Sequence, residues 1–398
     1  MRRPTLNYLK TESGAGLILV AAAALAVAVA NSREADRYFA LIATPIPVQV
    51  GGFAETLTLA GWVQRGLMPV FFLVLGMQMK FEMLRGELSN PRRLAFPALA
   101  AAGGLAVPAL LFLALTGGQE PLAKIWPAAA ATDVSVALAV LALAGPRLPS
   151  SLRILLMSVA IADDLAVAAL RAVLHRHDLV WPMAVGAAGS LAGLMALSRW
   201  PRAPFLFYAV GFVLVWAFAL KAGLDTSLAG FACALTVPIG ARRLGQESVL
   251  KFFMDSLHPY VAFAVLPLFA FTAAGFSLRD LTLAQAAGAL PLAIAAALWL
   301  GKPLGVFGIS GLAAVFKLAR RPTGAGWAEI LGVAMLSGVG LTVSLFFAAV
   351  ASGGAPARAE AATRLAVAAG SLLSALSGAT LISWAQRRRS EKGEDVSG

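Results

Sequence analysis

The chain has 398 residues, of which 59% are hydrophobic and only 13% are charged. Soluble globular domains carry about 45–50% apolar and about 25% charged residues, so this composition is typical of a helical protein that crosses the membrane many times. A membrane β-barrel would show short alternating segments, whereas here the apolar runs are continuous and about 20 residues long. The single Cys233 excludes an internal disulfide and a cysteine metal site.

Apolar runs follow one another along the chain and predict an all-α polytopic membrane fold with about twelve spans. The first run follows the basic residues of the N-terminus, a pattern that a signal peptide also shows, but it is long enough to cross the membrane. We expect a cytoplasmic N-terminus at 1–13, a single transmembrane domain at 14–385 and a cytoplasmic tail at 386–398. The expected spans are 14–30, 60–82, 95–116, 123–144, 150–174, 182–198, 204–220, 223–240, 257–276, 286–315, 327–350 and 362–385.

The segment between the first two expected spans, residues 31–58, is polar and contains Pro45 and Pro47. Residues 48–59, VQVGGFAETLTL, alternate in a β-like way around the pair Gly51 and Gly52. This pattern predicts a small β-hairpin, which we place outside the cell.

Placing the N-terminus inside the cell puts most of the 32 lysine and arginine residues in cytoplasmic segments. Such a bias sets the orientation of membrane proteins, so both termini are expected in the cytoplasm. It also accounts for the net charge of +12 without a nucleic-acid partner. No basic patch interleaved with aromatic residues favours nucleic-acid binding.

Two expected spans carry small, hydroxyl and glycine residues in their middle: PAAAATDVSVA at 127–137 and LSGVGLTVS at 336–344. Unwound backbone at that depth is tolerated only inside protein or beside water. A matched pair of interrupted spans indicates a transporter built from an inverted-topology repeat, here spans three to five and ten to twelve. The alternative for either segment alone is that its small residues allow close helix packing.

Two adjacent carboxylates, Asp163 and Asp164, lie near the middle of the fifth expected span. An ionisable residue at bilayer depth is costly and marks a functional site by default. Burial and the like charge of its neighbour disfavour ionisation, so at least one of the pair is expected to exchange a proton near neutral pH. The same oxygen atoms suit Na⁺ or Li⁺, and competition between H⁺ and cation is sufficient for exchange. A purely structural polar cluster is the alternative.

Three further residues are expected to support this pair. Asp133, beside Thr132, lies in the interruption of the fourth span, where a carboxylate would offset the positive ends of half-helices or simply cap one of them. Lys302 lies in the interior of an apolar span and needs an anionic partner, for which Asp133, Asp163 and Asp164 are the candidates. The alternative for Lys302 is that its side chain reaches the cytoplasmic face.

Five segments of the chain resemble the NhaA family of bacterial Na⁺/H⁺ antiporters, and the likeness runs along nearly the whole chain. They are ATDVSVALAVLALAG at 131–145, LMSVAIADDLA at 156–166, the region 257–278, GKPLG at 301–305 and GVGLTVSLF at 338–346. The resemblance implies that Asp164 and Asp163 bind cation and proton at the base of a cytoplasmic funnel. It implies that Lys302 is the charged partner of Asp163, and that Asp133 and Thr132 lie where two broken helices cross.

The resemblance also implies an inner-membrane protein that is not an enzyme and needs no cofactor. Its ligands would be the transported Na⁺, Li⁺ and H⁺, with more protons than sodium ions exchanged and activation at alkaline pH. It would sit in the lipid bilayer as a homodimer that forms partly through the external hairpin. Its role would be the regulation of pH and sodium.

Several residues depart from the family pattern: Gln78, Asp225 and Met254 at positions tied to pH activation, and Arg65 and Arg171 at positions expected to be acidic or apolar. These departures support an alternative function, a divergent member with altered or lost exchange that serves as a pH or ion sensor or as a proton leak. An intramembrane aspartyl protease is disfavoured, because neither of its usual aspartate motifs occurs.

Candidate pH-sensing residues are Lys80, Glu82 and His258. Histidine titrates near physiological pH, so all three histidines invite this interpretation. We expect His175 and His177 to be solvated in an external loop. His258, at the expected start of the ninth span, is the better candidate, although packing is the simpler role for it.

Overall fold

The computed structural model describes residues 12–118, 125–174, 179–200, 204–240, 248–278, 282, 287–341, 344–345 and 357–391. The chain forms two compact units, each assembled from separate stretches of the sequence. The first unit comprises Met1–Ala35, Glu87–Asp164 and Ala273–Gly398, and the second comprises Asp36–Gly86 and Leu165–Thr272. Helix α9, Ser150–Leu174, begins in the first unit and ends in the second.

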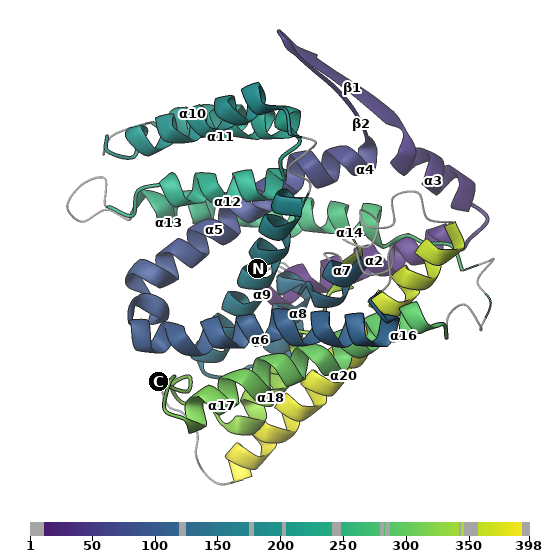
Figure 1. Ribbon diagram of the computed structural model, residues 1–398, viewed down its shortest axis with the longest axis vertical. Coiled ribbons are helices and arrows are strands. Elements are labelled where there is room, and N and C mark those ends of the chain that lie inside the picture. Colours follow the sequence, from purple (N-terminus) through teal and green to yellow (C-terminus); the bar gives the residue numbers. More distant parts are fainter. Residues whose placement is uncertain are drawn as a thin grey trace, which may run out of the picture. The chain divides into compact units, whose positions relative to one another are not determined.

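The first unit is helical (Figure 1). Its elements besides α9 are α2 (Glu12–Ala30), the 3₁₀ turn η2 (Glu87–Ser89), α6 (Pro91–Thr116), α7 (Trp126–Ala130), α8 (Val134–Ala144), α16 (Ala289–Ala296), the π-helical segments η6 (Ala297–Gly301) and η7 (Leu304–Ile309), α17 (Ser310–Val315), α18 (Trp327–Leu336) and α20 (Ala357–Glu391). Helices α18 and α20 run side by side, and α6 packs along η6 and η7.

The second unit combines helices with a two-stranded ribbon (Figure 1). Its elements besides α9 are α3 (Ala35–Ala43), β1 (Pro45–Val50), β2 (Phe53–Thr58), α4 (Leu59–Trp62), η1 (Val63–Leu67), α5 (Met68–Arg85), α10 (Trp181–Leu197), α11 (Phe205–Ala222), α12 (Thr226–Thr236), α13 (Val249–Tyr260), η5 (Val261–Val265) and α14 (Leu266–Ala274). Strands β1 and β2 pair antiparallel, with Pro45 opposite Thr58. The predicted hairpin is therefore confirmed, and Gly51 at its tip has the positive φ of 58° that glycine adopts readily.

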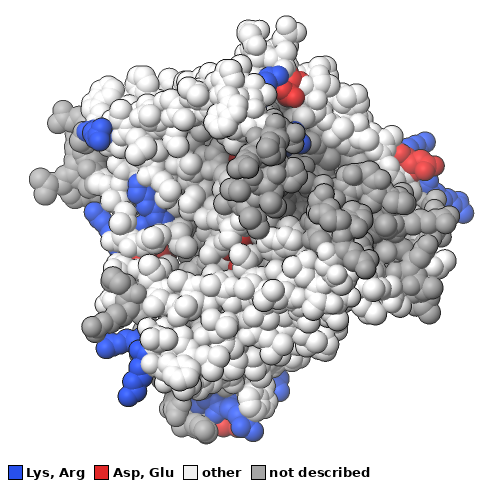
Figure 2. Space-filling view, viewed as in Figure 1, with Lys and Arg blue, Asp and Glu red and all other residues white. Residues whose placement is uncertain are grey.

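Among the described residues, seven helices are long and apolar enough to cross a membrane, or eight if the bent pair Gly14–Ala30 and Ala35–Ala43 counts as one span. The seven are Leu59–Arg85, Leu94–Thr116, Trp126–Ala144, Phe205–Ala222, Val249–Ala274, Ala289–Val315 and Ala361–Arg389. On the face seen in Figure 2, uncharged residues predominate and the charged side chains form small separate groups. These features are those of a polytopic membrane protein, while the number of twelve spans stays a prediction.

Two boundaries differ from the sequence prediction. Helix α3 lies within the polar segment 31–58, where the sequence predicts only the hairpin. Helix α13 begins at Val249 rather than at residue 257, because the hydroxyl of Ser248 accepts a hydrogen bond from the backbone N–H of Lys251 and caps the helix there. His258 therefore lies inside this helix and not at its start.

Helix α6 and the Lys302-bearing helix approach each other at glycines. A Cβ atom built on Gly103 would collide with the carbonyl oxygen of Gly305, and one built on Gly301 would lie 2.8 Å from Cα of Pro108. Both contacts involve backbone, which cannot move aside as a flexible side chain can. Close backbone packing of this kind explains why glycine occupies these positions in two apolar helices.

We expect Gly103→Ala to destabilise the protein by about 1–3 kcal/mol, because the added methyl group overpacks the contact with Gly305. Gly193→Ala, in α10, is the matched control, since no atom lies within 4 Å of the added Cβ. The control should be neutral or stabilise by up to about 1 kcal/mol, because glycine is unfavourable inside a helix. Thermal unfolding in detergent measures both changes, and equal midpoints for the two variants would contradict the packing described.

Candidate functional site

A break between two helices lies against the residues that follow a third helix in the first unit. Helix α7 ends at Ala130 and α8 begins at Val134, while α18 ends at Leu336. The backbone N–H of Asp133 donates to the carbonyl of Val339 at 2.6 Å, and the hydroxyl of Thr132 donates to the carbonyl of Ser337 at 2.7 Å. Polar groups of Thr132 and Asp133, in the break between α7 and α8, thus pair with backbone carbonyls that follow α18, as buried unwound backbone requires.

Asp133 is the N-cap residue of α8. Its carboxylate accepts a hydrogen bond from the backbone N–H of Val136 at 3.2 Å, and its side chain is buried. The positive end of the α8 dipole offsets part of the charge of this carboxylate. The capping role and the proposed electrostatic role of Asp133 therefore coincide.

Lys302 lies between the π-helical segments η6 and η7 and is fully buried. Its ammonium group forms an ion pair and a hydrogen bond with the carboxylate of Asp163. It also donates to the hydroxyl of Thr132 at 2.8 Å. Among the three candidate acids, Asp163 is therefore the ion-pair partner of Lys302. The buried side chain of Lys302 does not reach an aqueous face.

Asp164 differs from its neighbour in having no charged partner at hydrogen-bond distance. Its side chain is 1% exposed, and neither carboxylate oxygen makes a hydrogen bond of regular geometry with the described residues, although the backbone N–H of Thr132 is close enough to act on it. The charges of Asp163, Lys302 and Asp133 are all close enough to act on it. Because Lys302 balances Asp163 and the α8 N-terminus offsets Asp133, Asp164 is the carboxylate whose charge is least compensated.

Asp163 and Asp164 are both buried, each 1% exposed. The cytoplasmic funnel that the family resemblance implies around them stays a prediction. The adjacent residues of α9 point in different directions, as a helical step of about 100° requires, and only Asp163 reaches Lys302.

Comparison with known proteins identifies the family. The family model described as Na⁺/H⁺ antiporter 1 matches residues 6–382. The chain belongs to this family. It is 41% identical over 375 residues to the Na⁺/H⁺ antiporter NhaA 2 of Pseudomonas savastanoi pv. phaseolicola, covering 94% of this chain and 93% of that protein. It is 40% identical over 388 residues to the Na⁺/H⁺ antiporter NhaA of Rhodospirillum rubrum, covering 96% of this chain and 97% of that protein.

The three candidate pH-sensing residues of this family member belong to the second unit. Lys80 donates from its ammonium group to the carbonyls of Leu235 and Val237, at 2.6 and 2.7 Å, where α12 ends. A lysine at this position satisfies carbonyls that the end of a helix leaves unpaired. Glu82 lies in the last turns of α5, and His258 is half-buried in α13. Their part in pH sensing stays a prediction, and His175 and His177 lie outside the described residues.

Among the residues expected to depart from the family pattern, Asp225 has a clear structural role. It is the N-cap residue of α12, and its carboxylate accepts from the backbone N–H of Ser227 at 2.9 Å. Arg65 lies in the π-helical segment η1, where its backbone carbonyl accepts from the indole of Trp216 at 2.6 Å. The described hydrogen bonds of these two residues hold helices in place: one caps α12, and the other ties η1 to Trp216 of α11.

Two serine side chains also form hydrogen bonds with backbone groups at this site, and the sequence analysis did not single them out. The hydroxyl of Ser371, on α20, accepts from the backbone N–H of Gly340 at 3.0 Å. The hydroxyl of Ser344 donates to the carbonyl of Ala131 at 3.4 Å. Polar residues inside an apolar helix were the available signal, since buried hydroxyl groups need partners.

Proposed function

We propose that this protein exchanges Na⁺, or Li⁺, for H⁺ across the bacterial inner membrane and exports sodium with the energy of the proton gradient. The observation that carries the proposal is the buried, unpartnered carboxylate of Asp164 beside the Asp163–Lys302 ion pair. Membership of the Na⁺/H⁺ antiporter 1 family supports the assignment. Both termini would be cytoplasmic, the hairpin external, and the interrupted helices part of an inverted-topology repeat of twelve spans.

The charges of the site suit exchange of one ion for another. Three carboxylates, on Asp133, Asp163 and Asp164, share this region with one ammonium group, on Lys302, so the ionised site has an excess of negative charge. A buried carboxylate without a partner is strongly destabilised, and either a proton or a hard cation on Asp164 relieves this. Because both ligands use the same oxygen atoms, each displaces the other.

The surrounding oxygen atoms suit an alkali cation. Hard cations bind carboxylate, hydroxyl and carbonyl oxygens. Thr132 supplies a hydroxyl oxygen, and the backbone at Ser337 supplies a carbonyl oxygen. Both lie in the part of the site that also holds Asp163. Opening of the site toward one side of the membrane at a time would then convert this competition into transport.

Proteoliposomes test the proposal. With the purified protein reconstituted and a pH gradient imposed, addition of Na⁺ or Li⁺ should dissipate the gradient, while K⁺ should not. The measurement should be repeated over a pH series, because the departures at Gln78, Asp225 and Met254 predict a pH profile unlike that of the family. Dissipation that is independent of added cation would favour the alternative, a proton leak, and no dissipation at any pH would favour a sensor.

A further inference from the structure

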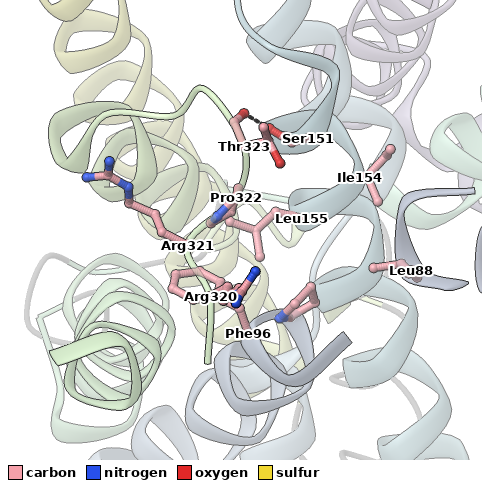
Figure 3. A pocket seen from close by; sticks show the side chains of 10 residues that line it. Leu88, Phe96, Ser151, Ile154, Leu155, Arg320, Arg321, Pro322 and Thr323 are labelled. Atoms are coloured by element: carbon pink, nitrogen blue, oxygen red, sulfur yellow. Dashed lines mark hydrogen bonds between the residues drawn. The ribbon is translucent and has the colours of Figure 1, made fainter. Parts of the chain in front are cut away.

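A cavity lies at one end of the first unit, where α6 and α9 begin and where the segment between α17 and α18 passes over them (Figure 3). Phe96 of α6 and Leu155 of α9 form its apolar floor, and residues 320–323 form its rim. The cavity is small and half open to solvent, and its enclosed part, about 30 Å³, has room for only one or two water molecules. A larger ligand would therefore sit at its mouth.

The rim of the cavity carries a cation. Figure 3 shows the side chain of Arg320 among Phe96, Leu155 and Pro322, while that of Arg321 is turned away. The guanidinium of Arg321 lies over the ring of Trp327, 5.5 Å from its centroid. In the part of the chain that the structure describes, no carboxylate lies within ion-pair distance of Arg320, so its guanidinium keeps donors for a ligand.

The loop that presents Arg320 is held in place. The hydroxyl of Ser151, in the first turn of α9, donates to the backbone carbonyl of Thr323 at 2.8 Å. A planar guanidinium with several N–H donors binds the oxygen atoms of a phosphate or carboxylate in a bidentate way. The positive charge at the rim of the cavity therefore favours an anionic ligand with an oxygen-rich group.

The residues that precede Arg320 indicate the source of such an anion. Leu312, Val315, Phe316 and Leu318 directly precede the arginines and are 56–71% exposed. Large apolar side chains exposed at the end of a membrane-crossing helix lie against acyl chains, which places the arginines that follow at the level of the lipid headgroups. Basic pockets between membrane helices bind anionic headgroups.

We propose that the phosphate of an anionic phospholipid headgroup binds at the mouth of this cavity, on the guanidinium of Arg320. The acyl chains lie along the exposed apolar residues at the end of α17. A bound headgroup links the 320–323 segment to α6 and α9. Since α9 also carries Asp163, about 12 Å along the helix from Leu155, the lipid stabilises the helix that holds the exchange site.

Thermal unfolding of the purified full-length protein in detergent tests this proposal. Phosphatidylglycerol should raise the unfolding midpoint, whereas phosphatidylcholine, or inorganic phosphate at the same phosphate concentration, should not. Arg320→Gln should raise the phosphatidylglycerol concentration needed for half the effect at least tenfold, with Arg320→Lys in between. Arg147→Gln, which removes an exposed arginine from the loop before α9, is the matched control and should behave as the unchanged protein does.

Three outcomes would overturn the proposal: no stabilisation by phosphatidylglycerol, an undiminished response in Arg320→Gln, or an equal loss in Arg147→Gln. Stabilisation by inorganic phosphate as strong as that by phosphatidylglycerol would show a free-anion site and equally refute the assignment to lipid. Native mass spectrometry, counting retained phosphatidylglycerol in both variants, gives a second readout. Neither measurement involves transport, so the result is independent of the proposed exchange.

Discussion

Asp164→Asn is expected to reduce Na⁺-driven proton movement in proteoliposomes by about 100-fold or more, while the protein stays folded. Asparagine has the same shape but neither ionises nor releases a proton. Loss of a buried negative charge weakens cation binding by several kcal/mol, and each 1.4 kcal/mol is tenfold. Asp255→Asn removes a carboxylate from an exposed position of α13 and should leave the rate unchanged.

The stability of Asp164→Asn separates loss of the site from loss of the fold. Because the charge of Asp164 is buried without a partner, its neutral replacement should unfold at the same temperature as the unchanged protein, or higher. Low activity together with an unchanged or raised midpoint would support the role of Asp164. Full exchange by the variant would show that another group binds the ion.

Lys302→Met is expected to have the largest effect on stability, a loss of about 3–5 kcal/mol, because it leaves Asp163 buried without its ion-pair partner. The double variant Asp163→Asn/Lys302→Met removes both charges and should recover most of this loss. Thermal or denaturant unfolding of the two single variants and the double variant measures the coupling between them.

The chain provides a matched control for this cycle in Lys221 and Glu55, an ion pair of 2.5 Å whose side chains are 34% and 24% exposed. A pair open to solvent contributes about 0–1 kcal/mol, so Lys221→Met, which also removes a hydrogen bond to the carbonyl of Ala54, should cost much less than Lys302→Met. If Lys302→Met were no more destabilising than Lys221→Met, the ion pair between Lys302 and Asp163 would not form as described.

The membrane class and the main interruption of the fold could be predicted because they depend on residue type. Continuous apolar runs predict spanning helices, and the small residues around Asp133 predict the interruption found between α7 and α8. The hairpin followed from alternation around Gly51 and Gly52. The partner of Lys302 could be limited to three acids by charge alone, but the choice of Asp163 required the three-dimensional arrangement.

Other features could not be predicted because they depend on backbone geometry. The carbonyls of Ser337 and Val339 accept hydrogen bonds from Thr132 and Asp133. Every residue has a backbone carbonyl, so the residue types at 337 and 339 do not predict these contacts. The π-helical segments on both sides of Lys302 reflect local adjustment around Pro303, which lacks an N–H, and around the close contact with α6. The buried ion pair of Glu329 with Arg389, at 3.0 Å, joins residues far apart in the sequence.

The burial of the two acids also could not be predicted from the sequence. A pair of acids indicates that a proton and a cation compete, but not how far water reaches them. The described structure buries both carboxylates, and that of Asp164 has no side-chain partner in the described part of the chain. Exchange requires that ions reach Asp164, and the equilibrium between its buried and accessible forms should respond to the ion bound there.

Proton release on sodium binding tests the central claim most directly. The purified protein, in a weakly buffered solution at alkaline pH, is titrated with Na⁺ while a pH indicator follows the solution. The account predicts the release of about one proton or more for each Na⁺ bound, and no release from Asp164→Asn. Sodium binding without proton release, or undiminished release from Asp164→Asn, would contradict competition between the two ions at this carboxylate.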